Sequence, residues 1–388
     1  MLSKTFHKLF LIERPSISLS LFRLAVAVTT GFHVLPTFFH LHDNYFHTAF
    51  KTHNANFFPI WFLELVAKSP EWLIVVFVFL FCFSWFAFLV GLFSQLSCIV
   101  MVFSCYYFYA LNAFHVGTLS WDILLVTLFL MCVTNYHSDY FSLDSLKRGD
   151  VYAYRRKRPY FIQRLLQMQI GFTFFYTALY KITGEGNWFK DNPIYYIMNY
   201  PSAGTTKYFL LRDFLREQPQ LCYWIGIGVV VVEFLMIFLL FCRKTRVSAI
   251  YLGCLFHITL ILTLDVPAIF FFLFPAQLFL FINPDIIVDW IEAKRQEQKG
   301  AGRPVLLYDG QCQFCQVNII LLKIMDLFAV FDYQDFHSVG DLKQLHPDLT
   351  QEKAKTQLHL ISQRGQLYGG FQAVRQMAFN LPMMWPGL

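Results

Sequence analysis

The residues with the clearest chemical potential are two cysteines three positions apart near the end of the chain. Cys312 and Cys315 stand between two apolar runs, of which the first, 305–308, predicts a buried strand and the second a helix. Cys312 is therefore expected at a helix N-terminus, where unpaired N–H groups and the helix dipole stabilise a thiolate. Cys315, one turn later on the same side, can resolve a mixed disulfide. The pair predicts thiol–disulfide chemistry.

Two other interpretations of this pair are a metal site and inert core cysteines. A zinc site needs a second pair of ligands, and His337, His346 and His359 lie scattered without a zinc-ligand spacing. An iron–sulfur cluster needs four cysteines. Inert cysteines fit poorly with the cap and turn residues that separate the strand from the helix. We therefore expect no metal here.

The surrounding segment predicts a small α/β domain. Strands at 305–308, 328–333 and 357–361, a turn at 363–365 and a helix over 371–379 follow in an order typical of a thioredoxin-like fold. The segment resembles the DCC family of predicted thiol-disulfide oxidoreductases, whose motifs are matched by Leu307-Tyr308-Asp309-Gly310-x-Cys312-x-x-Cys315, Gly369-Gly370-Phe371-x-Ala373 and Leu381-Pro382-x-x-Trp385-Pro386. This resemblance covers about 303–388 and implies that Asp309 and Gly310 support the dithiol. Members of that family usually continue further, so the domain is expected to be truncated at Leu388.

A second group of candidate residues lies in or at the ends of long apolar runs. Ionisable side chains within membrane spans are costly and point to function; those in this chain are Arg23, His33, His115, Asp122, Lys181, Glu233 and His257. We expect these side chains, together with Trp188, to converge on one cavity in the outer half of a helix bundle. The cavity would hold a quinone or a lipid-like substrate.

Lys181 is the sharpest candidate in this group, because it ends an apolar run and precedes a polar turn. A desolvated lysine loses its proton more readily and can act as a base. The alternative is a lysine that snorkels to the membrane interface. For Arg23, Asp122 and Glu233 the alternative is structural pairing between helices. A lone His115 or His257 is more often a satisfied bundle residue than a catalyst.

The same positions resemble a second family. The fifth-span segment of vitamin K-dependent gamma-carboxylases, and of the wider HTTM membrane family, is matched by Phe174-Phe175-Tyr176-x-Ala178-x-x-Lys181 with Trp188. Asn112-Ala113-Phe114-His115 resembles the Asn-Asn-His segment of the carboxylases, and Phe256-His257 resembles their later Phe-His. The resemblance covers about 10–283. It implies that Lys181 deprotonates a hydroquinone, that His115 and His257 assist, and that Arg23, Asp122 and Glu233 are polar positions typical of HTTM proteins. The extracytoplasmic domain that holds carboxylase substrates has no counterpart, which favours quinol deprotonation over protein carboxylation.

These side chains must be positioned by membrane-spanning helices. The 388 residues are 56% hydrophobic and only 14% charged, against about 25% charged in globular proteins. The net charge of +6 is modest and its bases fall in loops, which excludes a nucleic-acid binder. Runs of about 20 apolar residues can span a bilayer, and we identify eight, at 17–38, 72–93, 95–113, 119–135, 164–181, 222–242, 247–264 and 267–283.

The loop charges predict the orientation. An N-terminus inside the cell places twelve Lys and Arg residues on the cytoplasmic side and six on the other. Eight spans then bring the C-terminus, with Cys312, to the cytoplasm of what we expect to be a bacterial inner membrane. The predicted architecture is an all-α polytopic bundle over 1–284, an interfacial helix and linker over 285–303, and the DCC domain over 304–388.

Three functions compete. The first is a membrane thiol-disulfide oxidoreductase that acts on a protein disulfide or peptide. The cofactor expected for it is a membrane quinone or hydroquinone. The second is a carboxylase-like enzyme in which Lys181 is a base on a bound quinol. The third is a non-enzymatic membrane factor for peptide maturation, export or immunity. A copurifying quinone would support the first two, and activity that survives Cys312→Ser would remove the first.

Overall fold

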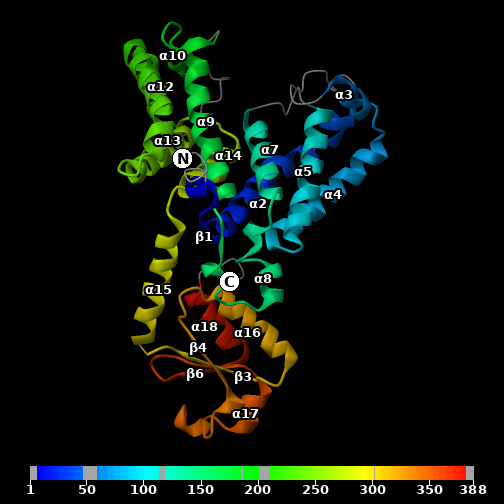
Figure 1. The fold of residues 1–388 in the computed structure, drawn as a ribbon, viewed down its shortest axis with the longest axis vertical. Coiled ribbons are helices and arrows are strands. Elements are labelled where there is room, and N and C mark those ends of the chain that lie inside the picture. Colours follow the sequence, from blue (N-terminus) through cyan, green and yellow to red (C-terminus); the bar gives the residue numbers. More distant parts are fainter. Residues whose placement is uncertain are drawn as a thin grey trace. The chain divides into compact units, whose positions relative to one another are not determined.

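The computed structural model describes residues 7–46, 59–112, 119–184, 187–200, 209–300 and 302–381. The chain forms two compact units, each with its own core. The first, here called the helical unit, comprises 1–138 and 157–283. The second, here called the sheet unit, comprises 139–156 and 284–388 (Figure 1). Each unit is therefore built from two separate stretches of the chain.

The helical unit consists mainly of α-helices. Among its described residues these are α2 (Ile17–Phe38), α3 (Ile60–Ala67), α4 (Glu71–Val90), α5 (Ser94–Leu111), α7 (Leu119–Cys132), α9 (Phe161–Thr183), α10 (Pro193–Asn199), α11 (Arg212–Arg216), α12 (Pro219–Phe241), α13 (Arg246–Thr263) and α14 (Ala268–Phe279). The short strands β1 (Glu13–Pro15) and β2 (Lys157–Pro159) pair antiparallel. Helix α9 packs along α12, α2 along α14, and α4 along α5 (Figure 1).

Five of the described helices, α2, α4, α5, α12 and α13, are long and apolar enough to cross a membrane. The number rises to six if α14 and the following α15 are counted as one bent span. The other predicted spans are weaker. Helix α7 has 14 residues, and α9 has 23 but carries three glutamines together with Arg164 and Lys181. Five or six membrane-capable helices are thus established, and eight spans stay a prediction.

Large apolar side chains cover the outer faces of these helices. Phe79 and Phe83 of α4 are 72% and 76% exposed, and Tyr251 of α13 is 75% exposed. Only 22–28% of α4, α12 and α13 is buried inside the protein. Apolar surface on this scale is unstable in water and stable against lipid chains. The helical unit is therefore suited to a bilayer.

The sheet unit is built around a four-stranded mixed sheet of order β4-β3-β5-β6. Its strands are β3 (Val305–Tyr308), β4 (Asp332–Asp335), β5 (His359–Ile361) and β6 (Leu367–Gly369). Strand β3 is parallel to β4 and antiparallel to β5, and β5 is antiparallel to β6. This arrangement follows the predicted order of strands and helices.

The two faces of this sheet have separate cores. On one face Leu306 and Leu360 pack against α16 (Gln313–Met325) and α18 (Gly370–Asn380). On the other face Leu307 and Ile361 pack against the segment that leads through α17 (Gln351–Thr356). The alternation of side chains along each strand produces this division. Helix α16, which begins beside the cysteines, is thereby anchored on the sheet (Figure 1).

The predicted strand at 328–333 is displaced, because β4 begins only at Asp332. Ala329 has a φ of 52°, in the left-handed region, which breaks an extended run. The Asp326 carboxylate also accepts hydrogen bonds from the backbone N–H groups of Val330 and Phe331, at 2.8 and 3.0 Å. These contacts hold the apolar stretch in a turn, so its hydrophobicity reflects burial rather than a strand.

The segment 139–156, which lies between α7 and α9 in the sequence, is part of the sheet unit. The Tyr140 hydroxyl donates to the Ile324 carbonyl at the end of α16, at 2.6 Å. The Arg155 guanidinium bonds Glu292 of α15 (Pro284–Gly300) at 2.6 Å, and Tyr154 donates to the same carboxylate. Helix α15, predicted as interfacial, belongs to this unit, and its Arg295 donates to the Leu327 carbonyl at 3.1 Å.

Candidate functional site

The two cysteines lie at the start of α16, as the sequence predicts. Cys312 is the N-cap residue, and its Sγ accepts a hydrogen bond from the Cys315 N–H at 3.3 Å. Both thiols are free of disulfide bonds. The Cys315 thiol and N–H, which donate to the Cys312 sulfur, hold the pKa of Cys312 below its usual range. The same hydrogen bond and partial burial raise the pKa of Cys315 to about 11. Cys312 is thus the more easily ionised thiol.

The loop before the cysteines is fixed by two carboxylates. The Asp309 carboxylate accepts from the Gln311 N–H at 2.9 Å, which is the main cause of its lowered pKa. The Gly310 N–H donates to Asp335 Oδ1 at 3.0 Å. A Cβ atom at Gly310 would lie 2.2 Å from Asp335 Oδ2, so the close approach requires a glycine. Both residues therefore shape the turn that presents Cys312.

His337 is a member of this cluster that sequence reasoning missed. Its Nε2 lies 3.1 Å from Asp309 Oδ1. In the sequence the two residues are 28 positions apart, and His337 entered only as an isolated possible zinc ligand. The parallel pairing of β3 with β4 brings them together, because both residues follow the same ends of neighbouring strands. Among the described residues, no group of three or more His, Cys, Asp or Glu side chains is arranged to hold a metal ion.

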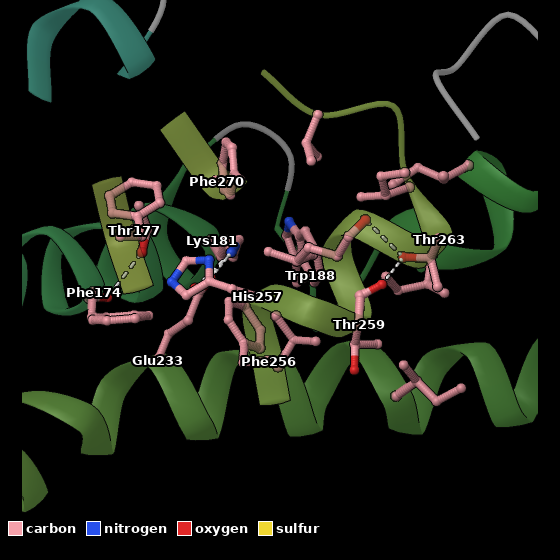
Figure 2. Close-up of a pocket in the computed structure, with 18 of the residues that line it drawn as sticks. Phe174, Thr177, Lys181, Trp188, Glu233, Phe256, His257, Thr259, Thr263 and Phe270 are labelled. Carbon is pink, nitrogen blue, oxygen red and sulfur yellow. Dashed lines mark hydrogen bonds and ion pairs between the residues drawn. The ribbon is translucent and has the colours of Figure 1, made fainter. Parts of the chain in front are cut away.

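A second site lies in the helical unit, where a cavity of about 860 Å³ opens between helices (Figure 2). Residues from α9, α12, α13 and α14 line it, with others from α10, α11 and the adjoining loops. Its wall is mostly aliphatic and aromatic, and the polar side chains are few. A pocket of this size and composition is typical of a site for a small, largely apolar ligand.

Lys181 and Glu233 meet in the wall of this cavity. The Lys181 Nζ lies 2.5 and 2.6 Å from the two oxygens of the Glu233 carboxylate. The ammonium also lies over the Trp188 ring, 4.8 Å from its centroid. The Lys181 side chain is 19% exposed and that of Glu233 6%. The lysine is thus paired with an acid rather than isolated, and the site has no net charge from this pair.

His257 is the least satisfied polar group of the cavity. It is 2% exposed, and neither ring nitrogen has a hydrogen-bond partner among the described residues. Its ring stacks on Phe274 with centroids 4.9 Å apart. A neutral imidazole has one donor and one acceptor nitrogen, and burying both without partners is unfavourable. The arrangement offers a hydrogen-bonding pair to a bound molecule.

The remaining predicted cavity residues lie elsewhere in the helical unit. Arg23 is fully buried and donates to the carbonyls of Phe88 and Leu89, the latter at 2.9 Å, in the last turn of α4. The Asp122 carboxylate accepts from the Tyr109 hydroxyl at 2.8 Å, and the His33 ring lies 5.4 Å from that of Trp121. None of the three lines the cavity described above. His115 falls outside the described residues.

Uncharged polar side chains inside the bundle were not singled out in the sequence. Gln163 and Gln167 of α9 both donate to the Leu280 carbonyl, at 2.6 and 2.7 Å. Gln277 of α14 donates to Gln169, which in turn bonds Thr127 of α7. Glutamine carries no charge and escapes a search for ionisable residues. The sequence signal that could have identified these glutamines is the spacing of Gln163 and Gln167, which are four residues apart and therefore lie on one face of α9.

Apolar helices joined to a small α/β unit with a Cys-x-x-Cys at a helix start define a membrane protein with a thiol-redox type domain. Comparison with family models agrees: residues 13–286 match the HTTM domain, and residues 306–388 match the DCC1-like thiol-disulfide oxidoreductase. The chain belongs to the HTTM family, and both resemblances drawn from its motifs are confirmed. No curated protein and no solved structure matches the chain.

The Lys181–Glu233 contact yields a prediction about stability. Lys181→Met leaves a buried carboxylate without its counter-charge, which typically costs about 3 kcal/mol or more. The double variant Lys181→Met, Glu233→Gln removes both charges and should recover most of that loss. Thermal unfolding of the full-length protein in detergent measures both. Lys190→Met, at an exposed position, is the control and should unfold like the unsubstituted protein. If the double variant is no more stable than Lys181→Met, the claim that the Lys181–Glu233 ion pair contributes to stability is contradicted.

Proposed function

We propose that this protein is a membrane-integral thiol-disulfide oxidoreductase whose nucleophile is Cys312. The observation that carries the proposal is the asymmetry of the two thiols. Cys312 caps α16 and receives two hydrogen bonds at its sulfur, whereas Cys315 donates its thiol proton and has a pKa raised to about 11. Thiol exchange needs this division between an ionised attacking sulfur and a protonated resolving one.

The reaction follows from the two thiols alone. The Cys312 thiolate attacks a substrate disulfide and forms a mixed disulfide with one of its sulfurs. The S–S bond of the substrate breaks, and the departing substrate thiolate takes up a proton. Cys315 then loses its proton to solvent and attacks the Cys312 sulfur, which releases the second substrate thiolate. Two electrons pass from the dithiol to the substrate, and a disulfide remains in the protein. A thioredoxin-like arrangement of the sheet unit supports this proposal.

The order of thiol reactivity tests the proposal. In the reduced full-length protein, limiting iodoacetamide at pH 7 should modify Cys312 at least about tenfold faster than Cys315, because only thiolates react. The Cys312 rate should fall as the pH drops through its pKa. Peptide mass spectrometry measures both rates.

Turnover of a model disulfide tests the same assignment. Cys312→Ser should abolish it, Cys315→Ser should trap a mixed disulfide, and Cys242→Ser, at an exposed thiol in the helical unit, should leave it unchanged. Faster modification of Cys315, or turnover by Cys312→Ser, would refute the assignment.

The proposed orientation has both termini in the cytoplasm, supported by the excess of Lys and Arg in alternate loops. In that compartment the pair would rest as a dithiol and act as a reductant. A membrane-impermeant maleimide should therefore miss Cys312 in intact cells and label it after lysis. An engineered Lys190→Cys, in a loop expected outside, should label before lysis. Labelling of Cys312 in sealed cells would reverse the orientation.

We propose further that the cavity of the helical unit binds an uncharged apolar molecule with a hydroxyl or carbonyl head, of which a membrane quinone or hydroquinone is an example. Three observations favour this ligand class. The lining is almost entirely apolar, and the Lys181 charge is already balanced by Glu233. His257 has unpartnered nitrogens for a polar head. In the carboxylase-like alternative, Lys181 acts as a base on a quinol. This role requires the Lys181 proton to be shared with the Glu233 carboxylate within the ion pair.

A bound quinone should copurify with the protein. Solvent extraction followed by mass spectrometry measures the quinone per protein chain. His257→Leu should lower that ratio at least fivefold, because the head group loses its hydrogen bonds, whereas Lys190→Met should not change it. For the base role, Lys181→Met should be combined with Glu233→Gln, so that loss of quinol deprotonation is not confused with unfolding. If no preparation contains a quinone, the ligand proposal is contradicted.

A further inference from the structure

The Asp309 carboxylate is the charged group nearest the two thiols in the described loop. The backbone N–H of Asp309 donates to the Cys315 sulfur, and the Asp309 charge opposes ionisation of both cysteines. A carboxylate beside a reactive thiol works against the low pKa that thiol exchange requires. A neighbouring group must therefore limit its effect.

His337 contacts that carboxylate directly. It lies on the short 3₁₀ turn η7 (Phe336–Ser338) that follows β4, and its Nε2 is 3.1 Å from Asp309 Oδ1. The imidazole packs on the Phe336 ring, with centroids 4.1 Å apart. The side chains of His337 and Asp309 are 28% and 30% exposed, and their contact lies at the protein surface.

The position of His337 is fixed by a second link to the same loop. Asp335 Oδ1 accepts from the His337 N–H at 3.1 Å and from the Gly310 N–H at 3.0 Å. One carboxylate oxygen thus joins η7 to the loop that carries the dithiol. The Asp335 carboxylate also packs directly against Gly310, where a Cβ atom would lie 2.2 Å from Asp335 Oδ2. The imidazole is preorganised toward Asp309.

The titratable side chains of the loop before the two thiols, and of the turn bonded to that loop, come from three elements. They are Tyr308 and Asp309 from β3 and its loop, Asp335 from the end of β4, and His337 from η7. Asp309 and Asp335 are both acidic, and Asp335 is already bonded to two backbone N–H groups. His337 is the member of this set that can carry a positive charge.

We propose that His337 is a positioning residue for the dithiol, which holds the Asp309 carboxylate and offsets its negative charge so that the Cys312 thiol is more easily ionised. The inference rests on the proposed redox function of Cys312 and adds a residue to it. Its Nε2–H donates to Asp309 Oδ1, and this hydrogen bond draws the carboxylate charge toward the imidazole. The effect on the sulfur passes through Asp309, so His337 needs no contact with substrate.

The test is the pH profile of Cys312 alkylation in the reduced full-length protein, followed on the Cys312 peptide. His337→Phe keeps the ring against Phe336 but removes the donor. We expect it to raise the apparent pKa of Cys312 by about half to one unit, which slows alkylation at pH 7 about threefold to tenfold. His337→Gln, which can still donate to Asp309, should restore the rate to within about twofold.

Two further variants separate this role from a structural one. In an Asp309→Asn background, which keeps the acceptor for Gln311 but removes the charge, His337→Phe should change the rate less than about twofold. His346→Phe removes a histidine that lies beside a different acid, Asp348, and should have no effect. An unchanged profile in His337→Phe, or an equal slowing in the Asp309→Asn background, overturns the proposal. Disulfide turnover by Cys312→Ser, measured separately, decides the redox function itself.

Discussion

A side chain inside a bilayer has no water to bond, so every polar group there must find its partners within the protein. This constraint decides which helices of the helical unit lie together. Arg23 satisfies the exposed carbonyls at the end of α4 and thereby fixes α2 beside it. Lys181 and Glu233 join α9 to α12. Gln163 and Gln167 bind the chain just after α14 to α9. Apolar packing alone would leave many such arrangements nearly equivalent.

The same constraint makes an exception informative. His257 is as deeply buried as Arg23, yet its ring nitrogens have no partner among the described residues. It lines the cavity instead of bonding a neighbouring helix (Figure 2). In the sheet unit the problem is solved differently, because backbone N–H groups of tight turns satisfy Asp309, Asp326 and Asp335. Charged groups there organise loops, whereas in the helical unit they organise helices.

Local patterns were enough to predict the elements around the dithiol. An apolar run of four residues followed by cap residues correctly located β3 and the start of α16, because both depend on neighbours in sequence. The strand expected at 328–333 was displaced, since its apolar residues are buried in a turn held by Asp326. Periodicity reports burial and not the hydrogen bonds that distinguish a turn from a strand.

Partners distant in the sequence were harder to predict. Lys181 and Glu233 were both identified as polar positions in spans, but their pairing across 52 residues depends on how α9 packs on α12. His337 was considered only as a metal ligand and set aside because it lacks a zinc-ligand spacing. Its contact with Asp309 depends on the pairing of β3 with β4. For the same reason, nothing in the run 139–156 indicates that Tyr140 completes the end of α16.

That contribution of 139–156 bears on how the molecule can be divided. A fragment cut at the glycine-containing linker near 302 would keep the whole sheet but lose α15 and the strip that bonds Ile324 and Glu292. In that fragment the Ile324 carbonyl would lack its hydrogen bond from Tyr140, and the apolar surface that α15 covers would be exposed to water. A water-soluble version for spectroscopy or crystallisation must instead splice 139–156 onto 284–388, so that one short polypeptide reproduces a body that the native gene encodes in two places.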